Sequence, residues 1–127
     1  MKYMAYVEKT NKLIEEEVTI NINSVVFIGF STVCSYKIEE GKSYPVILDI
    51  TIFGNIEINE GIDGVKSLKR INNSFEYRIS RILNRGFIDA GIIITDEGEI
   101  FPEHSEYFNK YAEIEVDRIN IEFVKEG

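Results

Sequence analysis

Basic residues are concentrated between positions 64 and 86, a segment that holds six of them and one acid, Glu76. Its net charge is therefore +5, and because the whole chain carries −8, the remainder carries −13. The rings of Phe75, Tyr77 and Phe87 are interleaved with the cations. Cationic strands that also carry aromatic rings are typical of folds that hold single-stranded nucleic acid or another phosphate ligand. The candidate binding residues are Lys66, Lys69, Arg70, Phe75, Tyr77, Arg78, Arg81 and Arg85.

The alternation of strand faces also allows a purely structural explanation for the residues of this segment. In an extended strand Arg78 points away from Tyr77 and Ile79, so the apolar side chains can face the core while the cation pairs with an acid on a neighbouring strand. The negative charge of the whole chain also repels a phosphate backbone and favours a basic partner. We therefore predict a non-enzymatic, acidic module that binds a basic protein partner, with nucleic-acid or phosphate binding through the 66–85 segment as the alternative.

The stretch Asp96–Glu106, DEGEIFPEHSE, gathers most of the remaining candidate chemistry, because it contains the only histidine, His104. A metal site would combine His104 with Glu103 or Glu106 and with Asp96. One histidine supplies too few strong ligands for zinc, and the spacing does not match a calcium loop. Acids also favour the N-terminus of a helix, so we predict a solvated acidic turn that leads into a helical turn.

Other catalytic or cofactor arrangements are incomplete. Cys34 is the only cysteine and cannot form an internal disulfide. Gly41-Lys42-Ser43 resembles the end of a phosphate-binding loop, but Tyr36 stands where that loop needs its first glycine. Carboxylates such as Asp49 fall on the polar faces of predicted strands. An enzyme that acts through Asp96, Glu99 and His104 is the least favoured hypothesis, and we expect no cofactor and no metal.

The element that positions these residues most clearly is Tyr44–Asn59, YPVILDITIFGNIEIN. Its even positions from Val46 to Ile58 are branched aliphatic residues apart from Gly54, and its odd positions are mostly polar. A period of two predicts a strand with one buried face. A hairpin turn at Gly54-Asn55 would mix apolar and charged groups on both faces. We therefore predict one continuous strand that is bent or bulged at Gly54.

The N-terminal half contains two further predicted β segments. Tyr3–Val7 alternates as a short strand, and residues 10–17 form a turn or one helical turn. Val18–Phe30 is either one long bent strand or two strands around a tight turn at Asn23-Ser24. Residues 31–42 connect this segment to the long strand.

The C-terminal half continues the β pattern. Residues 60–74 are predicted as a loop with a short irregular or helical piece. Phe75–Leu83 and Phe87–Thr95 are predicted strands around a three-residue loop, in which Gly86 supplies a positive φ. Ile100-Phe101 is predicted as a short strand, and Pro102 is predicted to open a helical turn. The final strand, Tyr111–Val124, changes phase, which predicts a bulge near Asp117-Arg118.

Composition supports the same architecture, because Ile and Val together number 31 whereas Leu and Ala together number 7. We predict a mainly β, single-domain protein over residues 1–127, built as a small barrel or curled β-sandwich with long bent strands and one or two short helical turns. Residues 1–17 form an N-terminal extension or an edge hairpin. In strand length and glycine-marked bends, residues 18–124 resemble the five-stranded oligonucleotide/oligosaccharide-binding (OB) barrel. No residue motif identifies a family.

Location in the cell is predicted from what the sequence contains at its start and along its length. The first residues, MKYMAYVEKTNK, lack the apolar core and small-residue cleavage site of a secretory signal. The longest uncharged apolar run falls far short of the roughly 20 residues that a membrane helix needs. We therefore expect a cytoplasmic protein that does not enter a membrane.

Overall fold

The computed structural model describes residues 1–32, 34, 36–64 and 67–125. These residues form eleven strands and one 3-10 helix, so the predicted mainly β fold is confirmed. The elements are β1 (Tyr3–Thr10), β2 (Glu17–Ile22), β3 (Val25–Ser31), β4 (Ser43–Thr51), β5 (Glu57–Glu60), β6 (Ser67–Arg70), β7 (Tyr77–Asn84), β8 (Phe87–Asp89), β9 (Ile93–Thr95), η1 (Phe101–Tyr107), β10 (Lys110–Val116) and β11 (Arg118–Phe123). No helix among them is long and apolar enough to cross a membrane.

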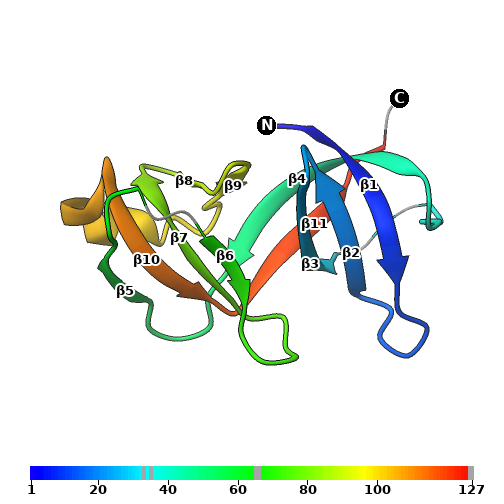
Figure 1. Ribbon diagram of the computed structural model, residues 1–127, viewed down its shortest axis with the longest axis horizontal. Helices are drawn as coiled ribbons and strands as arrows, with labels where there is room; N and C mark the ends of the chain where they lie inside the picture. The colour runs from blue at the N-terminus through cyan, green and yellow to red at the C-terminus, as the bar shows by residue number, and fades with distance from the viewer. Residues whose placement is uncertain (33, 35, 65–66, 126–127) are drawn as a thin grey trace.

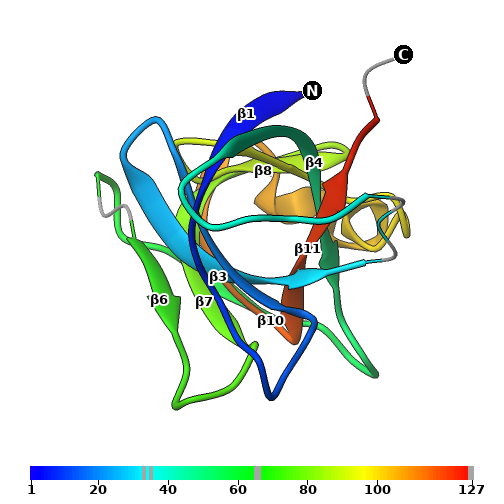
Figure 2. The same cartoon turned by 90° about the vertical axis from the view of Figure 1, so that its right-hand side faces the viewer.

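Five of these strands close into a mixed barrel, which we call the barrel lobe (Figure 1, right; Figure 2). The ring runs β1-β2-β3-β11-β4 and returns to β1. The β3–β11 pairing is parallel, and the other four are antiparallel. Because β1 pairs with both β2 and β4, the N-terminal strand is a full member of the ring. The buried side chains of the lobe come from alternate positions of these strands: Ala5, Val7, Val18, Ile20, Ile22, Phe27, Val46, Leu48, Ile50, Ile119, Ile121 and Phe123.

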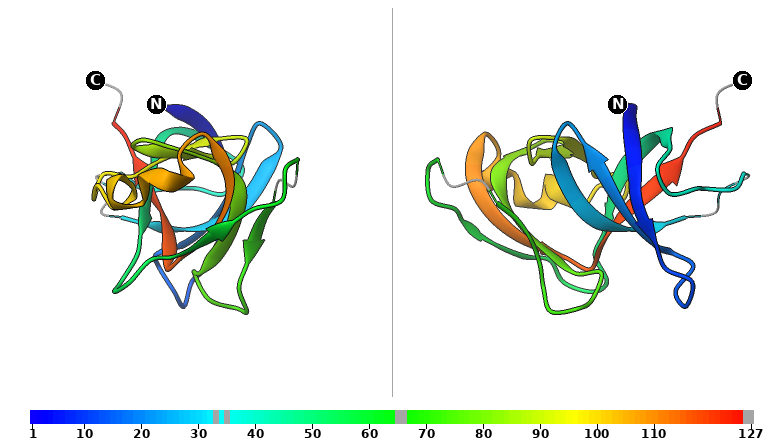
Figure 3. Two further views of the ribbon diagram at one scale, coloured as in Figure 1. Left: turned by 90° about the vertical axis from the view of Figure 1, so that its left-hand side faces the viewer. Right: turned by 45° about the vertical axis from the view of Figure 1, so that its right-hand side comes forward.

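The remaining elements, β5–β10 and η1, form the second lobe (Figure 1, left; Figure 3). Its central strand is β7, which pairs with β10 along one edge and with β6 and then β8 along the other. The sheet continues through β9 to β4 of the barrel by the pair Asp49↔Thr95. Phe101 at the start of η1 is fully buried. The two lobes therefore share one continuous sheet.

Two chain segments cross between the lobes side by side. The first leaves β4 after Thr51 and reaches β5 at Glu57, and the second passes from β10 to β11 at Asp117. Asp117 joins them, because its backbone N–H donates to Thr51 O at 2.9 Å and its Oδ2 accepts from Phe53 N at 2.6 Å. The predicted phase change is confirmed, since buried positions are even-numbered in β10 and odd-numbered in β11.

The predicted bend at Gly54 is confirmed, but the prediction of a continuous strand is wrong. Strand pairing stops over residues 52–56, and Gly54 adopts a φ of +80°. A hairpin at this point is also excluded, because β4 pairs with β1, β9 and β11 while β5 pairs with β10. The glycine therefore lets the chain change partners as it leaves the barrel.

The segment Val18–Phe30 is a hairpin and not one long bent strand. Asn23 and Ser24 both have positive φ, of 51° and 70°, as a tight two-residue turn requires. Ile20 pairs with Phe27 across the turn, and both are buried. Val26, on the opposite face of β3, is 54% exposed.

Two predictions around β7 and β8 need correction, and one is confirmed. The loop after β7 has two residues rather than three, because Asn84 pairs with Phe87, although Gly86 has the expected positive φ of 83°. Phe87–Thr95 is not one strand. It reverses at Gly91, whose φ is 87°, into the antiparallel pair β8 and β9.

Two short segments also differ from prediction. Within residues 60–74 the described part contains strand β6 and no helix, because Ser67–Arg70 pairs with β7. Ile100-Phe101 is not a strand, since Ile100 is the N-cap of η1, and the helical turn predicted at Pro102 is confirmed. In residues 10–17 the turn alternative holds, because Asn11 Oδ1 accepts the backbone N–H groups of Leu13 and Ile14.

Candidate functional site

The predicted basic residues are spread over several faces of the second lobe, and Lys66 lies outside the described residues. Lys69 and Arg78 are opposite each other on the exposed face of β6 and β7. Arg78 Nη2 lies 2.6 Å from Glu115 Oε1, and its Nε lies 3.7 Å from Glu113 Oε1. The hydrogen bond and charge of Glu115 raise the pKa of Arg78. The cation is thus matched by acids of the adjacent strand β10.

Arg70 and Arg81 are engaged by other groups of the protein. Arg70 Nη2 lies 3.4 Å from Glu17 Oε1, which joins β6 to the barrel strand β2. Its Nε also donates to Ser74 O at 2.6 Å. Arg81 Nε donates to the backbone oxygen of Asp89 at 2.9 Å. These two cations therefore support the lobe junction and the β7–β8 hairpin.

The aromatic residues of the segment also separate. Tyr77 is 4% exposed and packs edge-on against Phe27 at 6.5 Å between ring centroids. Its hydroxyl accepts the backbone N–H of Ile28 at 2.8 Å, and burial raises its pKa. Phe75 packs edge-on against Phe30 at 5.3 Å.

Arg85 lies at the tip of the β7–β8 hairpin, with its guanidinium 5.5 Å from the ring of Phe108. It is exposed, whereas Tyr77 is buried in the core between the lobes. The described members of the predicted set thus lie in four places: the outer sheet face, the lobe junction, the buried core and a hairpin tip. The structure does not bring these side chains together into one surface.

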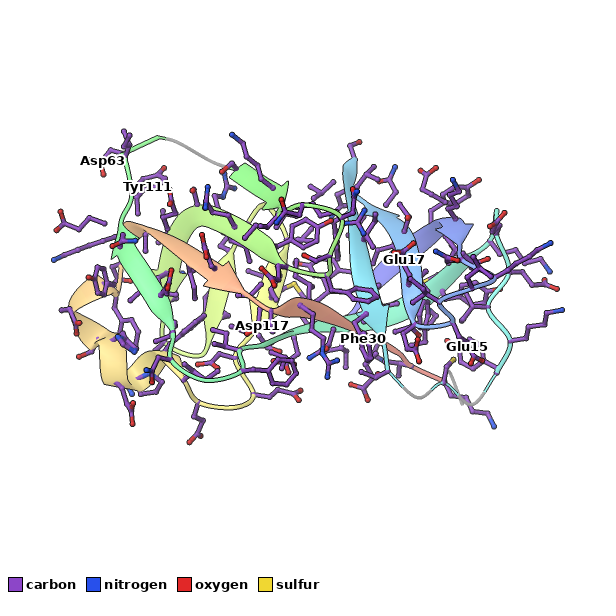
Figure 4. All side chains as sticks on the ribbon, turned by 90° about the horizontal axis from the view of Figure 1, so that it is seen from below. Glu15, Glu17, Phe30, Asp63, Tyr111 and Asp117 are labelled. Carbon is purple, nitrogen blue, oxygen red and sulfur yellow. The ribbon has the colours of Figure 1, made fainter. Side chains whose placement is uncertain are left out.

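A different group of residues forms a partly exposed cluster where the lobes meet. The guanidinium of Arg118 lies 3.8 Å from the ring centroid of Phe30 and 5.2 Å from that of Phe53. Phe53 is 64% exposed. Figure 4 shows Phe30 beside β11 and Asp117 where β10 passes into β11. We call Phe30, Phe53 and Arg118 the aromatic–arginine cluster.

Sequence reasoning missed this cluster because its members come from three distant segments. One signal was available: Phe53 is an aromatic residue at an odd position of Tyr44–Asn59, where most odd positions are polar. A large apolar side chain on a face predicted to be wet is a reason to look for a partner. The position of Arg118 beside it depends on the β4–β11 pairing, in which Arg118 is opposite Thr51.

A groove of about 360 Å³ is lined by residues of β4 and of the C-terminal half of β11. Asp49 in its wall accepts the backbone N–H of Glu97 at 3.0 Å and the hydroxyl of Thr95 at 3.4 Å. Asn120 Nδ2 donates to Thr51 Oγ1 at 2.6 Å. The lining residues of this β11 groove are Thr32, Ile47, Asp49, Glu97, Asn120 and Glu122.

A second cleft, of about 730 Å³, lies between the β1–β2 loop and the β3–β4 connection. Acidic and basic side chains line it together: Glu15 and Glu16 on one side, Lys12 and Lys37 among the rest. Cys34 is half-buried there, and its thiol donates to the backbone oxygen of Tyr36 at 3.1 Å. This cleft therefore presents no single charge to a ligand.

The acidic stretch before η1 has a structural role. Asp96 is 4% exposed, and its two oxygens accept the backbone N–H groups of Ile100 and Phe101 at 3.0 and 2.7 Å. The Asp96 carboxylate stabilises the start of η1, as expected for an acid at a helix N-terminus. His104 lies within η1 and lines neither cleft. In the part of the chain that the structure describes, no three His, Cys, Asp or Glu side chains are grouped as a metal site would need.

The comparisons with known proteins identify a family. No curated protein and no solved structure matches the chain. A family model matches residues 1–124, which is nearly the whole sequence. The chain therefore belongs to the family described as "Uncharacterised conserved protein UCP019853".

Proposed function

We propose that the protein is a non-enzymatic cytosolic binding module for a basic protein partner. The observation that carries the proposal is the pairing of two arginines of the basic segment with acids of the protein itself. Arg70 and Arg78 of the basic segment are each matched by acids from other strands. Because the chain has 22 acids and 14 basic residues, an excess of acids is left to face a partner. A surface of this kind attracts a positively charged protein and steers its approach.

The aromatic–arginine cluster supports protein recognition. Residues that dominate the binding energy of protein interfaces are enriched in aromatic side chains and arginine. Phe53 is mostly exposed and its ring lies near Arg118, so the cluster offers a large apolar contact beside a fixed charge. Holding the guanidinium between Phe30 and Phe53 also reduces the side-chain entropy that binding would cost.

The proposal is tested by affinity capture with the intact protein from a lysate of its native host. We expect a basic protein that is retained at low salt and released as the salt concentration rises. The parallel measurement is fluorescence anisotropy of labelled 15-mer oligo(dT) and oligo(rU) in 50 mM salt, where we expect no binding. Recovery of no protein, together with salt-dependent oligonucleotide binding, overturns the proposal.

A second candidate function is the binding of single-stranded nucleic acid by an OB-like barrel. The ring order β1-β2-β3-β11-β4 with a parallel β3–β11 pair favours this alternative, and so do the rings of Phe30 and Phe53 on its outside. OB barrels bind oligonucleotides on strands 2 and 3 and the neighbouring loops. If this function holds and uses the basic segment, anisotropy in low salt detects binding, and Arg78→Glu with Arg81→Glu abolishes it. Binding that survives this double change but is lost in Phe53→Ala assigns the contact to the cluster instead.

A further inference from the structure

We propose that the outer face of β11 is the docking strip for an extended segment of the basic partner. The strip consists of Arg118, Asn120 and Glu122, with the aromatic–arginine cluster at one end and the β11 groove at the other. One partner cation enters the groove, and an apolar partner side chain packs on Phe53. This inference rests on the proposed function and adds the site and the chemical pattern of the segment.

The strip is continuous because of strand geometry. Arg118, Asn120 and Glu122 occupy alternate positions of β11, while Ile119, Ile121 and Phe123 between and beyond them are buried. At about 3.4 Å per residue, Arg118 and Glu122 are about 14 Å apart along the strand. A partner in extended conformation covers that length with about four residues.

The neighbouring strands widen the strip. On β4, Thr51 and Asp49 lie opposite Arg118 and Asn120. On β3, Phe30 lies opposite Asn120. Because β11 is held between β3 and β4, a partner cannot simply extend the sheet at its edge. Recognition must use side chains laid across the sheet face.

Charge fixes the direction of the docked segment. Asp49, Glu97 and Glu122 place three carboxylates in the groove, which favour a lysine or arginine side chain there. Arg118 repels a cation at the opposite end and leaves space for an apolar or acidic residue beside Phe53. The partner segment therefore has a basic residue about four positions from a non-basic, apolar one.

Two polar atoms along the strip have no hydrogen-bond partner within the described residues: Arg118 Nε and Asn120 Oδ1. A buried polar atom without a partner destabilises the folded protein. Both atoms are buried, whereas Arg118 and Asn120 as residues are partly exposed, so a docked segment contacts the other atoms of these two side chains.

The test uses the full chain with the photo-crosslinker p-benzoylphenylalanine in place of Phe53. Matched probes replace Val26 and Ile62, which are 54% and 73% exposed and lie outside the strip. After irradiation in native-host lysate, the crosslinked segment is mapped by mass spectrometry. We expect capture from position 53, at least tenfold above either control, of a segment with Lys or Arg about four residues from the crosslink.

Charge-reversal variants separate the strip from the general acidity of the chain. Glu97→Lys with Glu122→Lys should lower the crosslink yield from position 53 at least tenfold. The control is Glu103→Lys with Glu106→Lys, which makes the same change of charge on exposed residues of η1 and should lower it less than twofold. Melting curves confirm that both variants are folded.

The outcomes distinguish the two proposals. Specific capture of a basic protein from position 26 or 62 alone overturns the docking strip and leaves the proposed function standing. A captured segment without the basic residue, or equal losses in the two charge-reversal variants, also overturns the strip. If no position captures protein and the oligonucleotides bind, both proposals fail.

Discussion

The barrel lobe and the second lobe enclose their cores in different ways. In the barrel lobe the ring is closed by backbone pairing, including the β1–β4 pairs from Tyr3↔Val46 to Tyr6↔Ser43. In the second lobe the sheet does not close on itself, because β5 pairs only with β10 and β6 pairs only with β7 among the described strands. Its core is completed by η1, whose Phe101 is fully buried.

Because the two cores are closed in different ways, the stability of the two lobes depends on different interactions. In the barrel lobe, which is closed by strand pairing, stability comes from many backbone hydrogen bonds, each of which contributes about 0.5–1.5 kcal/mol net. Closure by η1 depends on one large side chain and on Asp96, which holds the start of that helix. The docking strip that we propose belongs to the better closed lobe, which suits a surface that must be rigid before binding.

The largest effect is expected from Phe101→Ala. Removing this ring should leave a cavity in the second lobe and lower the free energy of unfolding by about 3–5 kcal/mol. Urea denaturation measures the loss, and hydrogen exchange should show amides of β7 and β8 opening before those of β1 and β2. Uniform loss of protection in both lobes would contradict the comparison.

In the barrel lobe, we expect the core to be destabilised by an added side chain at Gly29. A β-carbon on Gly29 would lie 2.5 Å from Ile121 Cδ1 and 3.1 Å from Ile119 O. We expect Gly29→Ala to lower the unfolding free energy by about 1–3 kcal/mol through overpacking. Ile121→Val removes Cδ1 but keeps a carbon at the Cγ1 position, which lies 2.6 Å from the added β-carbon, so the double variant should regain only part of the loss. If the two changes in unfolding free energy were strictly additive, the side chains at positions 29 and 121 would not be in contact.

The two hairpins show why the sequence predicted the strands better than the turns. At Asn23-Ser24 the turn has two residues, so Ile22 pairs with Val25 and the buried positions change parity. The apolar run continues on even positions into β3, which imitates one long strand. The pattern therefore located the β structure correctly and left its reversal undecided.

At Gly91 the turn does not change the parity of the buried positions, so the alternation pattern does not reveal it. The loop has an odd number of residues, so Ile88 pairs with Ile94 and the parity of the buried face is preserved. No test of alternation can separate such a hairpin from a continuous strand. The phase change at Asp117 was predictable because there the buried positions shift without a reversal.

The candidate site was less predictable than the fold for a related reason. Phe30, Phe53 and Arg118 are brought together by the parallel β3–β11 pair and by the segment that follows β4. Neither is visible as local spacing. The pairing of Arg78 with Glu115 likewise depends on the β7–β10 register. Alternation showed only that Arg78 faces away from the core.

A smaller effect is expected at the crossing between the lobes. Gly54 has a φ of +80° and no atom within 4 Å of an added β-carbon, so a substitution there tests backbone strain without a clash. Gly54→Val should cost about 1–2 kcal/mol of unfolding free energy. Gly54→Asn should cost less, since asparagine tolerates this conformation better. A valine variant as stable as the native protein would show that the crossing relaxes freely.

The smallest change in unfolding free energy is expected for Tyr77→Phe. This variant is also the most direct test of the contact between the two lobes. The Tyr77 hydroxyl accepts Ile28 N–H from the barrel lobe, so Tyr77→Phe should cost about 0.5–1.5 kcal/mol near neutral pH. Burial raises its pKa above the ordinary value of 10.0, which means that the folded state favours the neutral phenol. The stabilising contribution is therefore complete below pH 10 and is lost as the pH rises through the folded pKa. Denaturation at pH 7 and at pH 11 should show the difference between native protein and Tyr77→Phe shrinking at the higher pH, and a constant difference would mean that the phenol is not held in a buried junction.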